Sequence, residues 1–195
     1  VIQTQAKMNT FATSVNNLIN QYGLAGVDID WEFPAGWQAN GMATLCSTVK
    51  TKIGNKELSI AVAPIQYNSD GINSTAINAV DFINVMAYDD DRGGNHSSYA
   101  FAVDAINYWT ISKGAPTNKL RLGVPFYGRS GNNSSTYASL ITANPASYSQ
   151  LNTISGYTLN GQPLIKKKAQ DIVLSSGLDG IMIWAVDQDY SADTQ

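Results

Sequence analysis

The chain has 195 residues, of which 44% are hydrophobic and 14% are charged, with a formal net charge of −3. This length suits one domain with a sizeable core, and a slightly acidic chain without a basic patch argues against a nucleic-acid partner. No apolar run reaches transmembrane length, and the first residues carry no charged-then-apolar leader pattern. A single cysteine, Cys46, and a single histidine, His96, exclude an internal disulfide and a multi-histidine metal site.

Apolar residues at helical spacing alternate with short apolar runs, which predicts alternating helices and strands. The first helix contains Phe11 and Ile19 and ends at Tyr22, before a glycine suited to a helix C-cap. Further helices are predicted over about 38–53, 99–113 and 163–176. Strands are predicted over 24–32, 57–63, 81–88, 120–126 and 178–184. The Asn- and Ser-rich segment 131–162 is expected to be irregular or a small insertion.

Short apolar strands joined by helices predict parallel pairing, either in a barrel or in an open doubly wound sheet. No Gly-rich phosphate loop follows any strand, which argues against a nucleotide-binding sheet. A complete eight-stranded barrel needs roughly 250 residues. We therefore expect an α/β fold, a (β/α)8 TIM barrel truncated to about its last five strands. Residues 1–195 would form one partial barrel domain, with 131–162 as a small insertion after the fourth strand present.

Residues 24–32 hold three acids at alternating positions, Asp28, Asp30 and Glu32. In a strand these carboxyl groups share one face, with successive Cα atoms roughly 6.6 Å apart. The residues expected on the opposite, core-facing side are Val27, Ile29 and Trp31. Like charges this close raise the pKa of at least one carboxyl, and a carboxyl protonated near neutral pH can act as a general acid. A solvated or ion-paired strand end is the alternative, which the apolar flanks and the lack of a nearby basic residue disfavour.

Polar and aromatic residues also follow the other predicted strands. In a parallel barrel the carboxyl ends of the strands meet at one rim, where the chemistry is located. Aromatic faces beside carboxyl and hydroxyl groups form a surface that suits a sugar ring. The segments at this rim are Pro64–Tyr67, Met86–Asp89, Phe126–Arg129 and Met182–Asp187.

Four motifs in this order resemble the family 18 glycoside hydrolases, the chitinases and their relatives. The motifs are Ala25–Pro34, Met86–Asp89, Leu122–Arg129 and Gly180–Ala185. Ala25 replaces the first acid of the family signature Asp-Gly-x-Asp-x-Asp-x-Glu, and the Ser-x-Gly-Gly segment of the family is absent. The resemblance implies cis peptide bonds after Glu32 and after Trp184. Three absent strands would leave two open sheet edges, so these 195 residues alone are not expected to form a stable, active monomer.

The resemblance also implies a mechanism in which the substrate supplies the nucleophile. Glu32 would protonate the glycosidic oxygen, and the carbonyl oxygen of the 2-acetamido group of the substrate would attack. Asp30 would orient that group, and Asp28 would share a proton with Asp30. Tyr88 would donate its hydroxyl to the acetamido oxygen. Neither a metal nor another cofactor is implied.

Seven further residues would bind substrate by the same resemblance. Asp89 would bind sugar hydroxyls, and Trp184 would form the floor under the distorted sugar. The remaining five would line the cleft: Met86, Tyr127, Arg129, Met182 and, on the leaving-group side, Trp37. Structural roles are the alternatives for the aromatic residues: a barrel tyrosine for Tyr88, a core residue for Trp184 and a loop anchor for Trp37.

The function implied is a retaining chitinase acting on β-1,4-linked N-acetylglucosamine in chitin or chitooligosaccharides. The alternatives are an endo-β-N-acetylglucosaminidase acting on N-glycans or peptidoglycan-type sugars, and a non-catalytic chitinase-like lectin. Because an insoluble polymer cannot enter cells, a chitinase would be secreted. Outside the motifs, we expect Cys46 and Trp109 in the core, His96 as a polar loop residue and Lys166–Lys168 as a solvated helix face.

Overall fold

The computed structural model describes residues 4–191, and its centre is a five-stranded parallel sheet with the strand order β1-β2-β3-β4-β9. Every strand of this sheet runs in the same direction, as the alternation of helices and strands predicts. The strands are β1 (Gly26–Asp30), β2 (Glu57–Val62), β3 (Phe82–Val85), β4 (Leu120–Pro125) and β9 (Gly180–Trp184). An α/β fold with a parallel sheet is thereby confirmed.

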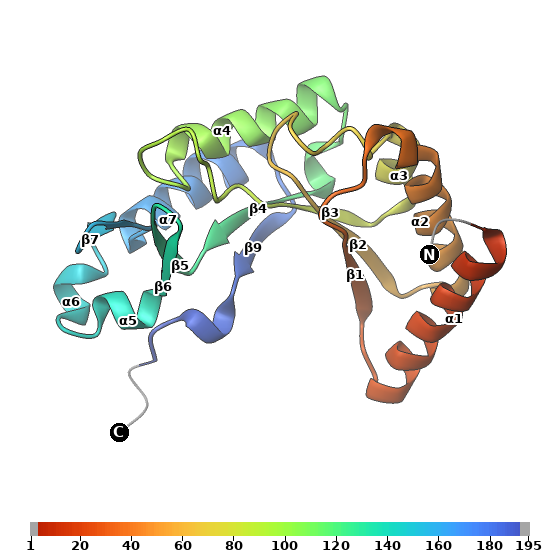
Figure 1. Cartoon of the computed structure of the whole chain (residues 1–195), viewed down its shortest axis with the longest axis horizontal. Helices are drawn as coiled ribbons and strands as arrows, with labels where there is room; N and C mark the ends of the chain where they lie inside the picture. Colours follow the sequence, from red (N-terminus) through yellow and green to blue (C-terminus); the bar gives the residue numbers. More distant parts are fainter. Residues whose placement is uncertain (1–3, 192–195) are drawn as a thin grey trace.

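Helices cover one side of this sheet and leave the other side open (Figure 1). The α-helices on that side are α1 (Gln5–Tyr22), α2 (Ala39–Ile53), α3 (Ser74–Ala79), α4 (Tyr99–Asn107) and α7 (Gln162–Lys168). α4 and α7 continue as π-helical turns, η2 (Tyr108–Ser112) and η4 (Ala169–Leu174). Three short 3₁₀ segments are η1 (Gly36–Gln38), η3 (Thr117–Lys119) and η5 (Val186–Gln188).

The ends of α1 follow local chemistry. The side chain of Thr4 accepts a hydrogen bond from the backbone N–H of Lys7 and caps the start of the helix. Gly23 adopts a left-handed conformation with φ 64° and ends it, as predicted. The chain then enters β1 after three residues, so the length of α1 determines where the acidic strand begins.

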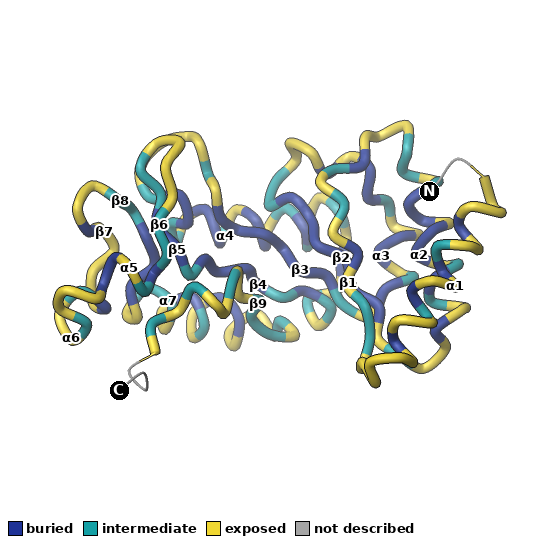
Figure 2. Tube along the Cα trace, turned by 60° about the horizontal axis from the view of Figure 1, so that its bottom comes forward, coloured by how far each residue is buried: buried dark blue, intermediate teal, exposed yellow. Residues whose placement is uncertain are grey.

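The core lies between the sheet and these helices, and burial falls toward both edges of the sheet. The central strands β2, β3 and β4 are almost entirely buried, whereas the outer strands β1 and β9 are only partly so (Figure 2). Trp109 is fully buried and donates its indole N–H to the carbonyl oxygen of Ala63 at 2.9 Å. Cys46 is also buried. Both residues are core residues, as predicted.

A second, antiparallel sheet with the order β6-β5-β8-β7 lies between β4 and α7 in the sequence. Its strands are β5 (Tyr127–Ser130), β6 (Asn133–Thr136), β7 (Thr153–Ile154) and β8 (Tyr157–Thr158). With α5 (Tyr137–Ile141) and α6 (Pro145–Tyr148) it encloses a small core of Tyr137, Leu140, Ile141, Ile154 and Leu159. The segment is therefore regular, and its sheet begins at Tyr127 rather than at 131.

The expectation of a solvated lysine face is wrong at one residue, and the loop residue His96 is buried. Lys168 is 0% exposed, because the helical period turns Lys166 and Lys167 outward and Lys168 inward. His96 is 4% exposed, because its loop folds back so that its ring packs against Tyr127. Within residues 4–191, no helix is long and apolar enough to cross a membrane.

Candidate active site

The acidic strand has the two faces that alternation predicts. Ile29 is buried, and Val27 and Trp31 pack against the core. Asp28, Asp30 and Glu32 are all exposed. β1 ends at Asp30, so Glu32 lies just beyond the strand, on the loop that leads to η1. The three carboxyl groups therefore lie along the open side of the sheet and at its carboxyl end.

Asp28 is held by residues of the two neighbouring strands. The Ser59 hydroxyl, directly opposite Asp28 in the register of β1 and β2, donates a short hydrogen bond to Asp28 Oδ1. Asn84 Nδ2 on β3 donates to the same oxygen at 2.9 Å. The sequence analysis missed both partners, because their contacts with Asp28 depend on the register of neighbouring strands. The two donors fix the direction of the Asp28 carboxyl group.

The pKa values of Asp30 and Glu32 are both raised, which is the direction that a general acid requires. Burial and then the negative charge of Asp28 raise the pKa of Asp30. Burial and then the charges of Asp30 and Asp89 raise the pKa of Glu32. The protonated form of Glu32 therefore persists to a higher pH than it would in an isolated glutamate.

Asp89 stands at the centre of a hydrogen-bonded cluster. Its backbone is left-handed, with φ 59°. Its Oδ1 accepts a hydrogen bond from the Tyr127 hydroxyl at 2.8 Å and lies 3.4 Å from both Arg129 Nε and His96 Nδ1. Burial raises the pKa of the Asp89 carboxyl, but the interaction with His96, the hydrogen bond from Tyr127 and the charge of Arg129 outweigh burial and leave the pKa lowered. The backbone N–H of Asp89 donates to His96 Nδ1 at 3.3 Å. Asp89 is thus an oriented carboxylate, and His96 is a partner that the sequence analysis missed.

An aromatic and thioether wall lies beside these acids. Met86, Tyr88 and Tyr127 are buried together, with Phe33 and Met182 packed against them. The Tyr88 and Tyr127 rings meet edge to face, with centroids 6.2 Å apart. Burial raises the pKa of both tyrosines, so both hydroxyls remain proton donors.

One cleft of about 530 Å³ brings together four of the predicted site residues, Glu32, Met86, Tyr88 and Asp89. Tyr127 and Arg129 join this group through Asp89, and Met182 joins it through Tyr88, whose hydroxyl oxygen lies 4.0 Å from the sulfur. The peptide bonds after Glu32 and Trp184 are both cis, as the resemblance implies. Glu32, the oriented carboxylate of Asp89 and the aromatic ring of Tyr88 therefore face one cavity, which suits a sugar ring.

Asp28 and Asp30 do not line this cleft, and Asp28 lines a separate depression with Ser59 and Asn84. Two further predicted residues, both tryptophans, also stand apart from the group. Trp184 ends β9, at the opposite edge of the sheet from β1, and is 52% exposed. Trp37 lies on η1 and is 84% exposed, outside the lining of the cleft. Neither position excludes sugar stacking, because both indole rings present free surface.

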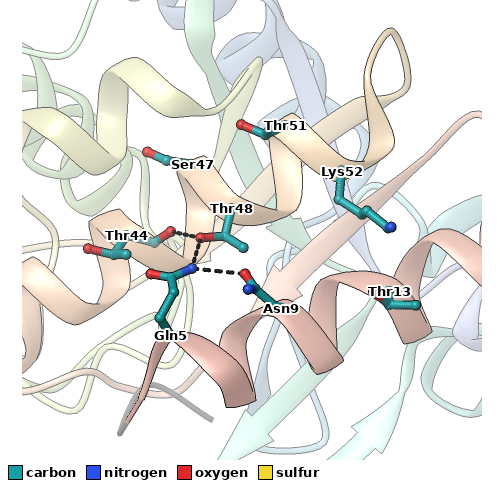
Figure 3. Close-up of a pocket in the computed structure, with 8 residues that line it drawn as sticks. All are labelled: Gln5, Asn9, Thr13, Thr44, Ser47, Thr48, Thr51 and Lys52. Atoms are coloured by element: carbon teal, nitrogen blue, oxygen red, sulfur yellow. Dashed lines mark hydrogen bonds between the residues drawn. The ribbon is translucent and has the colours of Figure 1, made fainter.

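A separate depression of about 590 Å³ lies between α1 and α2, on the helical side of the molecule (Figure 3). Amides and hydroxyls line it, and Gln5 Nε2 donates to Asn9 Oδ1 at 2.9 Å and to Thr48 Oγ1 at 3.2 Å. It contains neither a carboxylate nor an aromatic ring. Among residues 4–191, no group of three or more His, Cys, Asp or Glu side chains could hold a metal ion. The cleft at Glu32 is therefore the candidate site.

The sequence model described as glycosyl hydrolases family 18 matches residues 1–189. The chain belongs to this family. The family 18 chain is 31% identical over 154 residues to Chitinase 1 of Aphanocladium album, covering 64% of this chain and 36% of that protein. It therefore spans about a third of the length of the curated relatives that it matches.

Solved structures of chitinases share its fold. A family 18 chitinase, ChiB of Flavobacterium johnsoniae, is 32% identical, with a TM-score of 0.78 over 92% of this chain and 60% of that one. A chitinase of Bacteroides thetaiotaomicron is 23% identical, with a TM-score of 0.86 over 99% of this chain and 66% of that one. The family that the four motifs indicate is thereby confirmed, and the match covers nearly the whole chain.

Proposed function

We propose that this family 18 chain carries the catalytic residues of a chitinase, which hydrolyses β-1,4 linkages between N-acetylglucosamine units with retention of configuration. One observation carries this proposal: Glu32, whose pKa is raised, lines the same cleft as Tyr88 and Asp89. A protonated carboxyl beside a hydroxyl donor and an oriented carboxylate is what substrate-assisted glycoside cleavage requires.

In the proposed reaction Glu32 gives its proton to the glycosidic oxygen as the bond to the leaving sugar breaks. The carbonyl oxygen of the acetamido group of the substrate attacks the anomeric carbon and forms a cyclic oxazolinium ion. Asp30 accepts a hydrogen bond from the acetamido N–H and stabilises the positive charge, while Asp28 shares a proton with Asp30. Tyr88 donates its hydroxyl to the acetamido oxygen. Glu32 then removes a proton from water, which opens the ring on the same face.

The remaining site residues would bind the sugar chain. Asp89, oriented by Tyr127 and Arg129, would accept hydrogen bonds from sugar hydroxyls. Met86 and Met182 would form apolar walls beside Tyr88. The exposed rings of Trp184 and Trp37 would stack on sugars below the cleavage site and on the leaving-group side. The proposed chemistry requires no metal and no cofactor.

We further propose that the parallel sheet is part of a (β/α)8 TIM barrel, to which these residues contribute about the last five strands. Residues 1–195 would then be one partial catalytic domain, with a small insertion that begins at Tyr127 and ends before α7. The unpaired outer sides of β1 and β9 support this proposal. Closing the sheet into a barrel would bring Trp184 across from Glu32 and cover the open side of the acidic strand.

The proposed partners are chitin and chitooligosaccharides, with neither a nucleic acid nor a membrane involved. The proposed location is outside the cell, because an insoluble polymer cannot enter it. The net charge of −3 supports a neutral polymer rather than a polyanion as the ligand.

The test is Glu32→Gln, which keeps the shape of the side chain and removes the acid. Because the proposed barrel is larger than this chain, the assay uses the longer protein that contains it. We expect at least about a 100-fold loss of kcat on chitooligosaccharides with binding retained, since general acid catalysis contributes factors of this size. Glu57→Gln, at the other end of the strands, is the matched control and should leave turnover unchanged.

Wild-type turnover by Glu32→Gln would disprove the acid assignment. Binding without cleavage by the wild-type protein would indicate the chitinase-like lectin instead. Cleavage of a high-mannose glycopeptide in preference to chitin oligomers would indicate an endo-β-N-acetylglucosaminidase.

A further inference from the structure

The three consecutive lysines of α7 have different environments. Lys166 and Lys167 are exposed, whereas Lys168 is 0% exposed. Its ammonium lies 2.8 Å from the carbonyl oxygen of Ser97, 2.9 Å from Ser97 Oγ and 2.7 Å from Asn160 Oδ1. Within residues 4–191, no carboxylate forms an ion pair with Lys168.

The three oxygen atoms that contact the Lys168 ammonium all act as acceptors. The Ser97 hydroxyl donates its own proton to the carbonyl oxygen of Ala87 at 2.7 Å. Asn160 Nδ2 donates to the carbonyl oxygen of Ser97 at 2.9 Å, which leaves Oδ1 facing the lysine. Three acceptors match the three N–H groups of an ammonium, whereas a neutral amine has only two. The site is therefore complementary to the charged form of Lys168.

Ser97, a partner of Lys168, and Ala87, which accepts from the Ser97 hydroxyl, are covalent neighbours of active-site residues. Ala87 directly precedes Tyr88, and Ser97 directly follows His96, whose Nδ1 contacts Asp89 Oδ1 at 3.4 Å. The backbone N–H of Asp90 donates to the carbonyl oxygen of His96 at 2.9 Å. The loop from Ala87 to Ser97 thus leaves β3, carries Asp89 and returns to a point fixed by Lys168.

The buried charge of Lys168 is unfavourable for the stability of the fold. Removing a charge from water without a carboxylate partner costs free energy, and burial lowers the pKa of Lys168 to about 7. An apolar side chain of similar length would avoid that cost, but it would leave the buried Asn160 Oδ1 and Ser97 Oγ without this donor. What the ammonium adds is a fixed direction for three acceptors at once, two of which belong to Ser97.

We propose that Lys168 is a positioning residue of the hydrolase, which holds Asp89 in place through Ser97 and His96. This inference rests on the proposed function. Lys168 itself touches no substrate, because it lies behind the loop and not in the lining of the cleft. Its effect is therefore expected through Asp89, in both the binding and the turnover of the substrate.

The experiment compares Lys168→Met with Lys167→Met in the longer protein that contains the chain, on a soluble chitooligosaccharide. Lys167 is the matched control, because it is the adjacent lysine of the same helix, is exposed, and contacts Asp171 and the Tyr99 ring. We expect Lys168→Met to lower kcat by up to about 100-fold and to raise KM, since a displacement of about 1 Å in a site costs this much and Asp89 is proposed to bind sugar hydroxyls. Lys167→Met should stay within about twofold of wild type, and circular dichroism and the thermal midpoint report whether each variant is folded.

A double-mutant cycle with Asp89→Asn separates positioning from a general structural role. If Lys168 acts through Asp89, the effect of Lys168→Met is much smaller in the Asp89→Asn background than in wild type. The inference is overturned if the separate effects of Lys168→Met and Asp89→Asn on kcat multiply in the double variant. It is also overturned if Lys168→Met and Lys167→Met have the same kcat. A wild-type protein that cleaves no substrate would instead overturn the proposed function, and the positioning role with it.

If Lys168→Met does not fold, Ser97→Ala provides the test. This change deletes one hydroxyl, and with it one acceptor for Lys168 and the hydrogen bond to Ala87. A folded Ser97→Ala variant with lowered kcat and an effect that is not additive with Asp89→Asn supports the inference. A kcat within about twofold of wild type overturns it.

Discussion

At the residue scale, the site depends on the mutual influence of two carboxyl groups with opposite pKa shifts. The pKa of Glu32 is raised by burial and then by the charges of Asp30 and Asp89. The pKa of Asp89 is lowered by its interaction with His96 and its hydrogen bond from Tyr127, against the effect of burial. Such divergent environments assign one group to proton donation and the other to a permanently charged, oriented role.

Asp89→Asn should move the alkaline limb of the pH profile of kcat/KM to lower pH. The change removes a negative charge that raises the pKa of Glu32, so Glu32 loses its proton at a lower pH, and activity that needs the protonated acid falls earlier. The expected shift is less than about one pH unit, because the two groups are partly exposed to solvent. Asp91→Asn, in the same loop, is the control and should leave the limb in place. An unchanged or upward shift for Asp89→Asn would contradict the assignment.

The period of the acidic strand was enough to predict which residues face the open side and which face the core. It could not predict Ser59, Asn84 or His96 as partners of the acids, because their contacts depend on cross-strand register and on the path of a loop. The burial of Lys168 was not predicted, for a related reason. A run of identical charges suggests a solvated face, but a helix must turn one member of the run inward.

At the element scale, Asp81 joins three elements at the end of the sheet away from the cleft. Its carboxylate accepts hydrogen bonds from Lys50 Nζ at the end of α2 and from the backbone N–H of Leu58 at the start of β2, both at 2.7 Å. Asp81 itself immediately precedes β3. Burial raises its pKa, but the two hydrogen bonds and the charge of Lys50 outweigh burial and leave the pKa lowered.

Asp81→Asn should therefore destabilise the fold in a pH-dependent way. A carboxyl whose pKa is lowered on folding stabilises the protein above its unfolded pKa of about 3.9, and this contribution disappears as the pH falls through the folded value. We expect a loss of about 1 kcal/mol at pH 7, allowing for screening of this partly exposed group, and little difference near pH 3. Urea unfolding at the two pH values measures it, with Asp171→Asn in the exposed pair with Lys167 as control. An equal loss at both pH values would contradict the role of the charge.

The parallel strands were predictable as elements because each is a short apolar run between helices. Their ends were predicted one to three residues too long, since a burial pattern continues past the last ladder hydrogen bond, as at Glu32 and Tyr88. The antiparallel sheet was not predictable in detail. Its strands β7 and β8 hold two residues each, too few to show alternation, and turns such as Gly131, with φ 57°, dominate the composition.

At the scale of the whole molecule, the outer edges of the sheet determine whether these residues associate when they are produced alone. β1 and β9 each pair on one side only, and both are less buried than the strands between them (Figure 2). Unpaired backbone groups along a strand form hydrogen bonds with another strand where one is available. Ile183 on β9 presents an exposed apolar side chain on such an edge strand.

These 195 residues, produced alone, should therefore associate beyond the 21.0 kDa monomer as concentration rises. Two free edges permit open-ended pairing, so sedimentation velocity should show species larger than dimers. Ile183→Lys charges the β9 edge and leaves only β1 free, so association of this variant should stop at dimers joined through β1, because a charge on an edge strand disfavours pairing. A longer chain whose added strands pair with β1 and β9 should remain monomeric. A 21.0 kDa species at every concentration would show that these edges do not govern assembly and would remove the main support for barrel closure through them.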